Sequence, residues 1–493
     1  MPTKYLFQMG SLMPHKMLKF TEIDRATPEK RDVGTRTADF DEIYRDFAVA
    51  GAQAQASRCS QCGVPFCQQG CPLSNNIPDW LKLVAEDRME EAYRVSAATN
   101  NMPEICGRIC PQDRLCEGIC TIEQSGHGTV TIGAVERYIT DTAWDQGWIA
   151  DINPPKERDQ SIGIIGAGPA GLAAAEQLRK KGYQVTIYDR YDRGGGLLIY
   201  GIPGFKLEKH LVERRIAHLE RSGIVFKFNI DIGNDMSFDD VRHAHDAVLI
   251  ATGVYAPRDL KVPGIGASGV VPALTYLTAS NRKGLGDAVP EFDNGTLDTK
   301  DKRVVVIGGG DTAMDCVRTA TRQGAKSVTC LYRRDRENMP GSQREVANAE
   351  EEGVVFKWLS GPEAVLETKD NSVKGVRISE MRLGQPDASG RSRPIKTGET
   401  TDIKADMVIT ALGFDPEDLP ELWSINDLKV NRWGAVKIDW STMQTALPGV
   451  FAAGDIVRGA SLVVWGIKDG RDAAEAMHTY LKAQAKSSLI AAE

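Results

Sequence analysis

The sequence predicts an α/β fold with two Rossmann-like domains, preceded by an α-helical domain. Two observations in the second part of the chain indicate this class: short apolar runs alternate with longer amphipathic segments, and a glycine-rich fingerprint occurs twice. Such alternation is typical of parallel strands joined by crossover helices. The length of 493 residues suits two to four domains of about 150 residues each.

The first part of the chain has the pattern of a small helical domain, which we place at residues 1–155. Between Asp79 and Ala98, apolar residues recur at helical spacings among charged ones. The segment Asp151–Gln160 is polar and contains Pro154 and Pro155, which interrupt helices. This segment is therefore predicted to be the linker to the second part.

The second part of the chain contains one type of domain twice. The first copy opens with a strand and GAGPAG and closes with AVLIATG, whereas the second opens with a strand and GGGDTA and closes with MVITALG. The segment VFAAGD at Val450–Asp455 follows the second copy and is expected to complete the first. The predicted domains are therefore 156–300 with 425–493, interrupted by 301–424. The predicted strands are Ile162–Ile165, Val185–Tyr188, Val248–Ala251, Val304–Ile307 and Val408–Ala411.

Composition excludes several classes of partner and location. The net charge of -7 offers no basic excess for a phosphate backbone, so nucleic acid is not an expected partner. No apolar run approaches the roughly 20 residues of a membrane helix. Met1–Phe20 lacks the continuous hydrophobic segment of a secretory signal, and a cytoplasmic location is expected.

The first fingerprint predicts a dinucleotide site. Gly166, Gly168 and Gly171 follow a predicted strand and open a predicted helix, where they allow a tight turn, close approach of pyrophosphate and close helix packing. Asp189 ends the next strand, 23 residues after Gly166, where a carboxylate can accept hydrogen bonds from an adenosine ribose. The alternative is a glycine-rich turn without a ligand.

The second fingerprint predicts an NADPH site. Gly308, Gly310 and Ala313 keep the spacing, with Asp311 and Thr312 between them, and alanine at the third place still permits close helix packing. Arg333 and Arg334 end the next strand, where the first copy has Asp189. A guanidinium there pairs with the 2′-phosphate that distinguishes NADPH from NADH. The alternative is a pair of solvated surface arginines.

Eight of the ten cysteines crowd between Cys59 and Cys120, which indicates a metal or cluster site in a reducing compartment. The first run ends in a Cys-Pro pair, typical of ferredoxin-like runs whose last cysteine ligates another cluster, so the two runs are expected to interleave. A pair of zinc sites is the alternative, although the second run has no CxxC pair. The first run is Cys59, Cys62, Cys67 and Cys71, and the second is Cys106, Cys110, Cys116 and Cys120.

Further segments resemble the FAD-binding elements of two-dinucleotide, glutathione-reductase-like flavoprotein reductases. In that family the late aspartate, here Asp455, bonds the ribityl and pyrophosphate region, and the following helix, here Ala460–Arg471, points its N-terminus at the flavin ring. A simple helix cap is the alternative role for Asp455. The segments are Gly195, Gly196 and Leu197, then Ala251, Thr252 and Gly253, then Gly454 and Asp455.

Over nearly its whole length the chain resembles the small (beta) subunits of bacterial NADPH-dependent glutamate synthases. The motifs that carry the resemblance include RCSQCGVPFCQQGCP, YGIPGFKLEK, YRRDRENMPGSQREV and FAAGDIVRGASLVVW. The resemblance implies an oxidoreductase of ammonia assimilation, with FAD, NADPH and two [4Fe-4S] clusters, that passes electrons singly to a large (alpha) subunit. It also implies a hetero-oligomer in which the large subunit carries FMN and glutaminase activity and makes L-glutamate from L-glutamine and 2-oxoglutarate.

The cysteine region is also similar to the N-terminal domain of dihydropyrimidine dehydrogenase, and this similarity implies the ligand sets. The fourth ligand of the second cluster is a non-cysteine side chain, here Glu136, with Cys106 as the competing candidate. The implied ligands are Cys59, Cys62, Cys67 and Cys120 for one cluster, and Cys71, Cys110, Cys116 and Glu136 for the other.

The alternatives to this function differ in what receives the electrons. Related subunits serve ferredoxin-NADP transhydrogenases, sulfide dehydrogenases or pyrimidine reductases, and a scaffold with vestigial nucleotide sites is a further possibility. Hydride transfer needs no general base, and no Ser-His-Asp or Cys-His constellation is evident, so no catalytic side chain is predicted.

Overall fold

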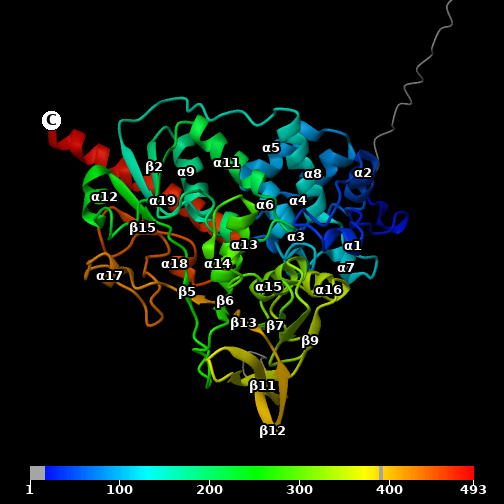
Figure 1. The fold of residues 1–493 in the computed structure, drawn as a ribbon. Coiled ribbons are helices and arrows are strands. Elements are labelled where there is room, and N and C mark those ends of the chain that lie inside the picture. The colour runs from blue at the N-terminus through cyan, green and yellow to red at the C-terminus, as the bar shows by residue number, and fades with distance from the viewer. Residues whose placement is uncertain (1–16, 388–391, 493) are drawn as a thin grey trace, which may run out of the picture. The chain divides into compact units, whose positions relative to one another are not determined.

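The computed structural model describes residues 17–387 and 392–492 (Figure 1). Most of Met1–Phe20, the stretch considered as a secretory signal, lies outside these residues. The chain divides into two compact units, one of Met1–Glu29 with Asp46–Ile149 and one of Lys30–Arg45 with Ala150–Glu493. Within the described residues, every helix is too short or too polar to cross a membrane.

The first unit is helical around a buried core that includes Trp80 and Val135. The predicted helix across Asp79–Ala98 is two helices, because the chain turns at Asp87, whose φ of 63° is left-handed and ends a helix. The helices of this unit are η1 (Lys19–Thr21), α2 (Val49–Ser57), α3 (Phe66–Gln69), α4 (Ile77–Ala85), α5 (Met89–Thr99), α6 (Pro103–Ile109), η2 (Gln112–Arg114), α7 (Thr121–Gln124) and α8 (Ile132–Asp145).

The second unit contains a first parallel sheet of five strands in the order β15-β4-β1-β2-β3. The C-terminal segment supplies β15, which pairs with β4 so that Phe451 lies opposite Leu249. The strands are β1 (Ser161–Ile165), β2 (Gln184–Asp189), β3 (Val225–Phe228), β4 (Ala247–Ile250) and β15 (Val450–Ala452). The accompanying helices are α9 (Pro169–Lys180), α10 (Leu197–Tyr200), α11 (Lys209–Arg221), α12 (Phe238–Ala244), α18 (Asp455–Arg458) and α19 (Val463–Ala492).

The same unit contains a second parallel five-stranded sheet in the order β6-β13-β7-β8-β9. It includes Val270–Pro272, from the range predicted for the first domain, because this short strand pairs with β13. The strands are β6 (Val270–Pro272), β7 (Arg303–Ile307), β8 (Ser327–Leu331), β9 (Val355–Lys357) and β13 (Met407–Thr410). The accompanying helices are α13 (Ala273–Gly284), α14 (Pro290–Asp293), α15 (Asp311–Arg322) and α16 (Gln343–Glu351).

Smaller elements connect or extend the two sheets. A two-stranded pair joins β5 (Ala256–Pro257), which follows β4 of the first sheet, to β14 (Phe414–Asp415), which follows β13 of the second. An antiparallel sheet consists of β10 (Ser360–Glu367), β11 (Val373–Pro386) and β12 (Ser392–Lys404). Its long strands β11 and β12 pair with each other and extend away from the second sheet (Figure 1). The remaining helices are α1 (Val33–Arg36) and α17 (Leu419–Leu422). The α/β fold class with two Rossmann-like sheets and a helical N-terminal part is confirmed.

Candidate functional site

The first fingerprint forms the turn between β1 and α9, and its three glycines have different surroundings. Gly166 has a φ of 112°, and a Cβ there would collide with the Ala251 carbonyl oxygen. A Cβ on Gly168 would meet nothing within 4 Å, whereas one on Gly171 would collide with the Gly166 carbonyl oxygen. The first and third glycines are therefore needed for the turn and the packing, and the second faces open space where a phosphate fits.

Asp189 orders the fingerprint loop. Its carboxylate accepts hydrogen bonds from the backbone N–H of Ala167 at 2.6 Å and of Tyr191 at 2.9 Å. Burial raises its pKa. Each carboxylate oxygen has a second lone pair, so the predicted contact with a ribose stays compatible with these two bonds.

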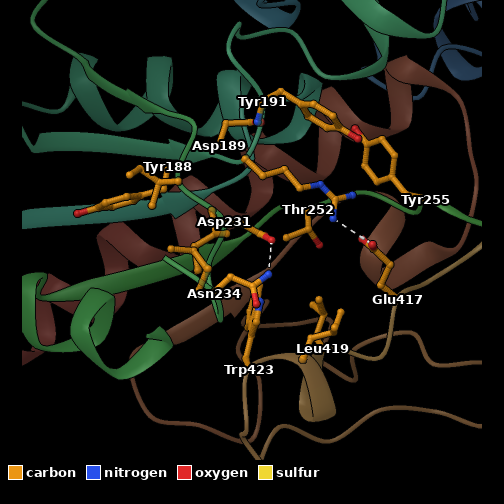
Figure 2. Close-up of a pocket in the computed structure, with 16 residues that line it drawn as sticks. Tyr188, Asp189, Tyr191, Asp231, Asn234, Thr252, Tyr255, Glu417, Leu419 and Trp423 are labelled. Atoms are coloured by element: carbon orange, nitrogen blue, oxygen red, sulfur yellow. Dashed lines mark hydrogen bonds and ion pairs between the residues drawn. The ribbon is translucent and has the colours of Figure 1, made fainter. Parts of the chain in front are cut away.

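Beside Asp189 lies a pocket with aromatic and charged walls (Figure 2). The Arg190 guanidinium lies 4.7 Å from the centre of the Tyr255 ring and donates a hydrogen bond to Glu417 at 3.0 Å. Tyr191 contributes a second ring, and Trp423 lines the far wall. Sequence reasoning missed these residues, because they come from three separate segments and no motif joins them. Flat walls of this kind suit the adenine end of a dinucleotide.

Most of the predicted FAD residues line a second pocket that continues from the first. The hydroxyl oxygen of Thr252 is buried and has no hydrogen-bond partner among the described residues, which fits a bound polar ligand. Burial raises the pKa of Asp455 to about 6. The predicted residues brought together here are Gly166, Gly168, Asp189, Leu197, Ala251, Thr252, Gly253, Gly454 and Asp455.

Three predicted FAD residues lie behind this pocket wall instead. Gly171 packs against Gly166, as described above. A Cβ on Gly196 would stand 3.0 Å from the Cα of Gly168, and one on Gly195 would meet the Val212 side chain at 2.6 Å. These glycines permit close packing around the pocket.

The second fingerprint repeats this geometry between β7 and α15. A Cβ on Gly308 would collide with the Ala411 carbonyl oxygen, whereas one on Gly310 would meet nothing within 4 Å. Ala313 is fully buried where the third glycine would pack. Asp311 accepts a hydrogen bond from the Ser342 N–H at 2.9 Å, so it orders the loop.

A pocket opens in front of this loop. Its wall includes Gly308, Gly310, Thr312, Arg333 and Arg334 of the predicted site. Sequence reasoning missed Arg258, which also lines the pocket and comes from the connection after β5. The arrangement offers backbone N–H groups for a pyrophosphate and three guanidinium groups for further phosphate.

The first implied set of cluster ligands lies together in the first unit. Burial raises the pKa of the Cys59 thiol to about 11, and the nearby Cys120 and Cys62 add to this effect. Burial likewise raises the pKa of Cys67 to about 12, with further contributions from Cys59, Cys120 and Cys62. The thiols of Cys62 and Cys120 therefore lie close to those of Cys59 and Cys67.

The second implied set also lies together. Burial raises the pKa of Cys71 to about 11, and Glu136 adds to the effect. A hydrogen bond with Cys106 lowers the pKa of Cys110, but burial and Glu136 outweigh it and the pKa is raised. Burial raises the pKa of Cys116 well above its usual range, with contributions from Cys71 and Glu136.

Both candidates for the last ligand adjoin this second set. Glu136 is buried, and burial raises its pKa to about 7. Its Oε1 accepts hydrogen bonds from the side-chain amides of Asn75 at 2.9 Å and Asn100 at 3.1 Å. The Cys106 thiol donates to the Asn100 Oδ1 at 3.7 Å. Asn100 therefore contacts both candidates.

All ten cysteines are free thiols, and a bound metal would deprotonate the coordinating ones. Among residues 17–387 and 392–492, no group of three or more His, Cys, Asp or Glu side chains is arranged to hold a single metal ion.

Comparisons with known proteins agree with this arrangement. Residues 36–148 match the 4Fe-4S cluster domain described as dihydropyrimidine dehydrogenase domain II, and residues 160–476 match the pyridine nucleotide-disulphide oxidoreductases. The structure of FprA from Mycobacterium tuberculosis in complex with NADPH shares the fold, with a TM-score of 0.57 and 20% identity over 67% of this chain and 86% of that chain.

Fold and sites together define a flavoprotein oxidoreductase that uses a pyridine nucleotide and carries 4Fe-4S clusters. The glutamate synthase (NADPH) small chain of Azospirillum brasilense is 61% identical over 480 residues, which is 97% of this chain and 99% of that protein. The one from Escherichia coli K12 is 44% identical over 95% of this chain and 100% of that protein. The chain belongs to the family of glutamate synthase (NADPH) small chains.

Proposed function

We propose that this chain is the electron-input subunit of a glutamate synthase, which oxidises NADPH and supplies the electrons to a larger subunit. The observation that carries the proposal is the sequence identity of 61% to a glutamate synthase small chain. The matched residues include the cysteine-rich unit and both nucleotide pockets. An electron-input subunit needs these three parts, because the donor, the flavin and the one-electron carriers each require a site.

The chain's own residues bind and orient the cofactors. When bound, FAD accepts hydride from NADPH and the 4Fe-4S clusters carry the electrons onward one at a time. Gly168, Thr252 and Asp455 hold the FAD, and the N-terminus of α19 at Val463 lines the same pocket, where its partial positive charge favours an anionic group.

The second pocket and the cysteines have corresponding roles. The loop at Gly310 holds the pyrophosphate of NADPH, and Arg333 and Arg334 recognise its 2′-phosphate. The clusters are held by Cys59, Cys62, Cys67 and Cys120, and by Cys71, Cys110, Cys116 and Glu136.

The relatives are named as the small chain of glutamate synthase, and this name implies a large chain as partner. We propose that this partner carries FMN and glutaminase activity and forms L-glutamate from L-glutamine and 2-oxoglutarate. The complex is a hetero-oligomer of the cytoplasm. This division leaves NADPH oxidation as the task of the present chain.

Anaerobic titration of the purified chain with NADPH tests the proposal. The flavin absorbance is expected to fall, and glutamate is expected to form only when the large chain, L-glutamine and 2-oxoglutarate are all present. Absence of flavin bleaching would exclude NADPH oxidation. Co-purification with a ferredoxin-linked partner instead of a glutaminase would assign the electrons to another acceptor.

A further inference from the structure

The motif YGIPGFKLEK at residues 200–209 has no role in either fingerprint. It begins at the last residue of α10, whose first residue, Leu197, lines the FAD pocket. The motif then continues through Phe205, which is 1% exposed, to Lys206. The motif therefore starts within three residues of the flavin pocket lining.

Lys206 connects this motif to the NADPH-binding part of the same unit. Its ammonium lies 2.8 Å from the carboxylate of Asp315 on α15, with side-chain exposures of 12% and 8%. Burial opposes the charge of Lys206, but Asp315, Glu345 and Asp311 outweigh this effect and its pKa is raised. The pair therefore joins the flavin side to the helix that follows the NADPH-binding glycines.

Phe205 makes a second connection to α15. The guanidinium groups of Arg318 and Arg322 lie 4.5 Å and 3.9 Å from the centre of its ring. Both guanidinium groups are held by Glu352, at 2.8 Å and 2.7 Å. Because these arginines are fixed by the carboxylate, the ring packs against a rigid surface.

The flavin end of the motif is held as well. The side-chain nitrogen of Lys209 donates hydrogen bonds to the carbonyl of Leu198, at 3.1 Å, and to that of Ile202. The Asn281 amide on α13 donates to the Tyr200 carbonyl at 2.9 Å. Residues 197–209 are therefore held to α13 through Tyr200, and to α15 through Phe205 and Lys206.

We propose that Phe205 and Lys206 are positioning residues for hydride transfer, because they fix helix α15 and its NADPH-binding loop relative to the flavin pocket. The inference rests on the function proposed above. In that reaction the C–H bond of the reduced nicotinamide breaks and its electron pair passes with the hydrogen to the flavin, leaving NADP⁺. A misplacement of about 1 Å can slow such a step on the order of 100-fold.

The test compares Lys206→Met with the control Lys283→Met in the full chain loaded with its cofactors. Lys283 forms an exposed pair with Asp293 in the same unit. Stopped-flow absorbance at saturating NADPH gives the limiting rate of flavin reduction, and titration with NADP⁺ gives the Kd. We expect Lys206→Met to lower the limiting rate about tenfold while the Kd changes by less than about threefold. Lys206→Arg should restore most of the rate, and the control should equal the wild type.

Three results would overturn the proposal: an unchanged limiting rate in Lys206→Met, a loss of NADP⁺ affinity as large as the loss of rate, or no rescue by arginine. If Lys206→Met does not retain FAD, Asp315→Asn gives the same test, because it keeps the side-chain volume while removing the charge. If NADPH did not lower the flavin absorbance of the wild type, the proposed function would be refuted, whereas the positioning role is refuted only by the three results above.

Discussion

The Arg334 guanidinium donates a hydrogen bond through its Nε to the Ser392 carbonyl at 3.0 Å. This bond ties the end of β8 to the start of β12, although the two residues are 58 positions apart. The Nε edge of the guanidinium is thereby fixed beside the NADPH pocket. The N–H groups on its two terminal nitrogens remain available to a ligand.

Replacement of Arg333 and Arg334 by alanine should weaken NADPH binding more than NADH binding. Since hydrogen bonds to charged groups contribute about 1.5–3 kcal/mol, and Arg333 is exposed to screening solvent, we expect about a tenfold rise in the KM for NADPH. Arg336→Ala is the matched control, because Arg336 pairs with Glu350 on the surface. Steady-state kinetics with both nucleotides gives the comparison, and equal losses would contradict recognition of the 2′-phosphate.

Glu136→Ala should remove one of the two clusters, while Cys106→Ala should keep both. The reason is that amide hydrogen bonds orient the Glu136 carboxylate, whereas the Cys106 thiol is engaged as a donor to Asn100. Iron and acid-labile sulfide per chain should fall by about half in Glu136→Ala, since one of two clusters is lost. The opposite pattern in the two variants would make Cys106 the ligand.

The same substitution at two glycines of one fingerprint should have different effects. Gly168→Ala places a methyl group in the open space of the pocket, so the chain should fold but retain less FAD. Gly171→Ala places it against the Gly166 carbonyl, so the thermal midpoint should fall by several degrees through strain in the fold. Flavin content and thermal unfolding separate these outcomes, and equal loss of FAD at unchanged stability in both would contradict the assigned roles.

Lys209 should make the stability of the protein depend on pH. Burial lowers its pKa to about 7, whereas the ordinary value is about 10.4. Between these values the unfolded chain holds a proton that the folded chain has lost, so stability rises with pH in this window.

The measurement is the Tm of the wild type minus that of Lys209→Met at each pH. This difference should increase from pH 7 to pH 10, and Lys283→Met, at an exposed lysine, serves as the reference variant. A constant difference for Lys209→Met would show that the amine titrates near its ordinary pKa.

The sequence predicts the two sheets well because their strands and glycine fingerprints are local patterns. Each glycine's role follows from its spacing, and the pocket around Thr252 and Asp455 assembles residues that motif comparison had singled out. Arg190 and Glu417 of the aromatic pocket escaped prediction, because an ion pair between positions 227 apart leaves no periodic signal.

The segment Lys30–Arg45 escaped prediction for the same reason. It lies within the range predicted for the helical domain but belongs to the second compact unit. There the buried Arg36 pairs with Glu351 at 2.6 Å and with Glu352 at 3.3 Å. Neither composition nor helical spacing distinguishes this arginine from a solvated one.

The pairing of β15 with β4 sets the order in which the protein can mature. In this pairing, Val450 lies opposite Val248, which is 202 positions earlier in the chain. Asp455 lies three residues after the end of β15. During synthesis, a nascent chain already displays Gly166 and Gly168 long before the last strand and Asp455 leave the ribosome. With Asp455 in its proposed role, flavin binding has to await this last strand, whereas the second sheet, whose strands have all emerged by Thr410, can form beforehand.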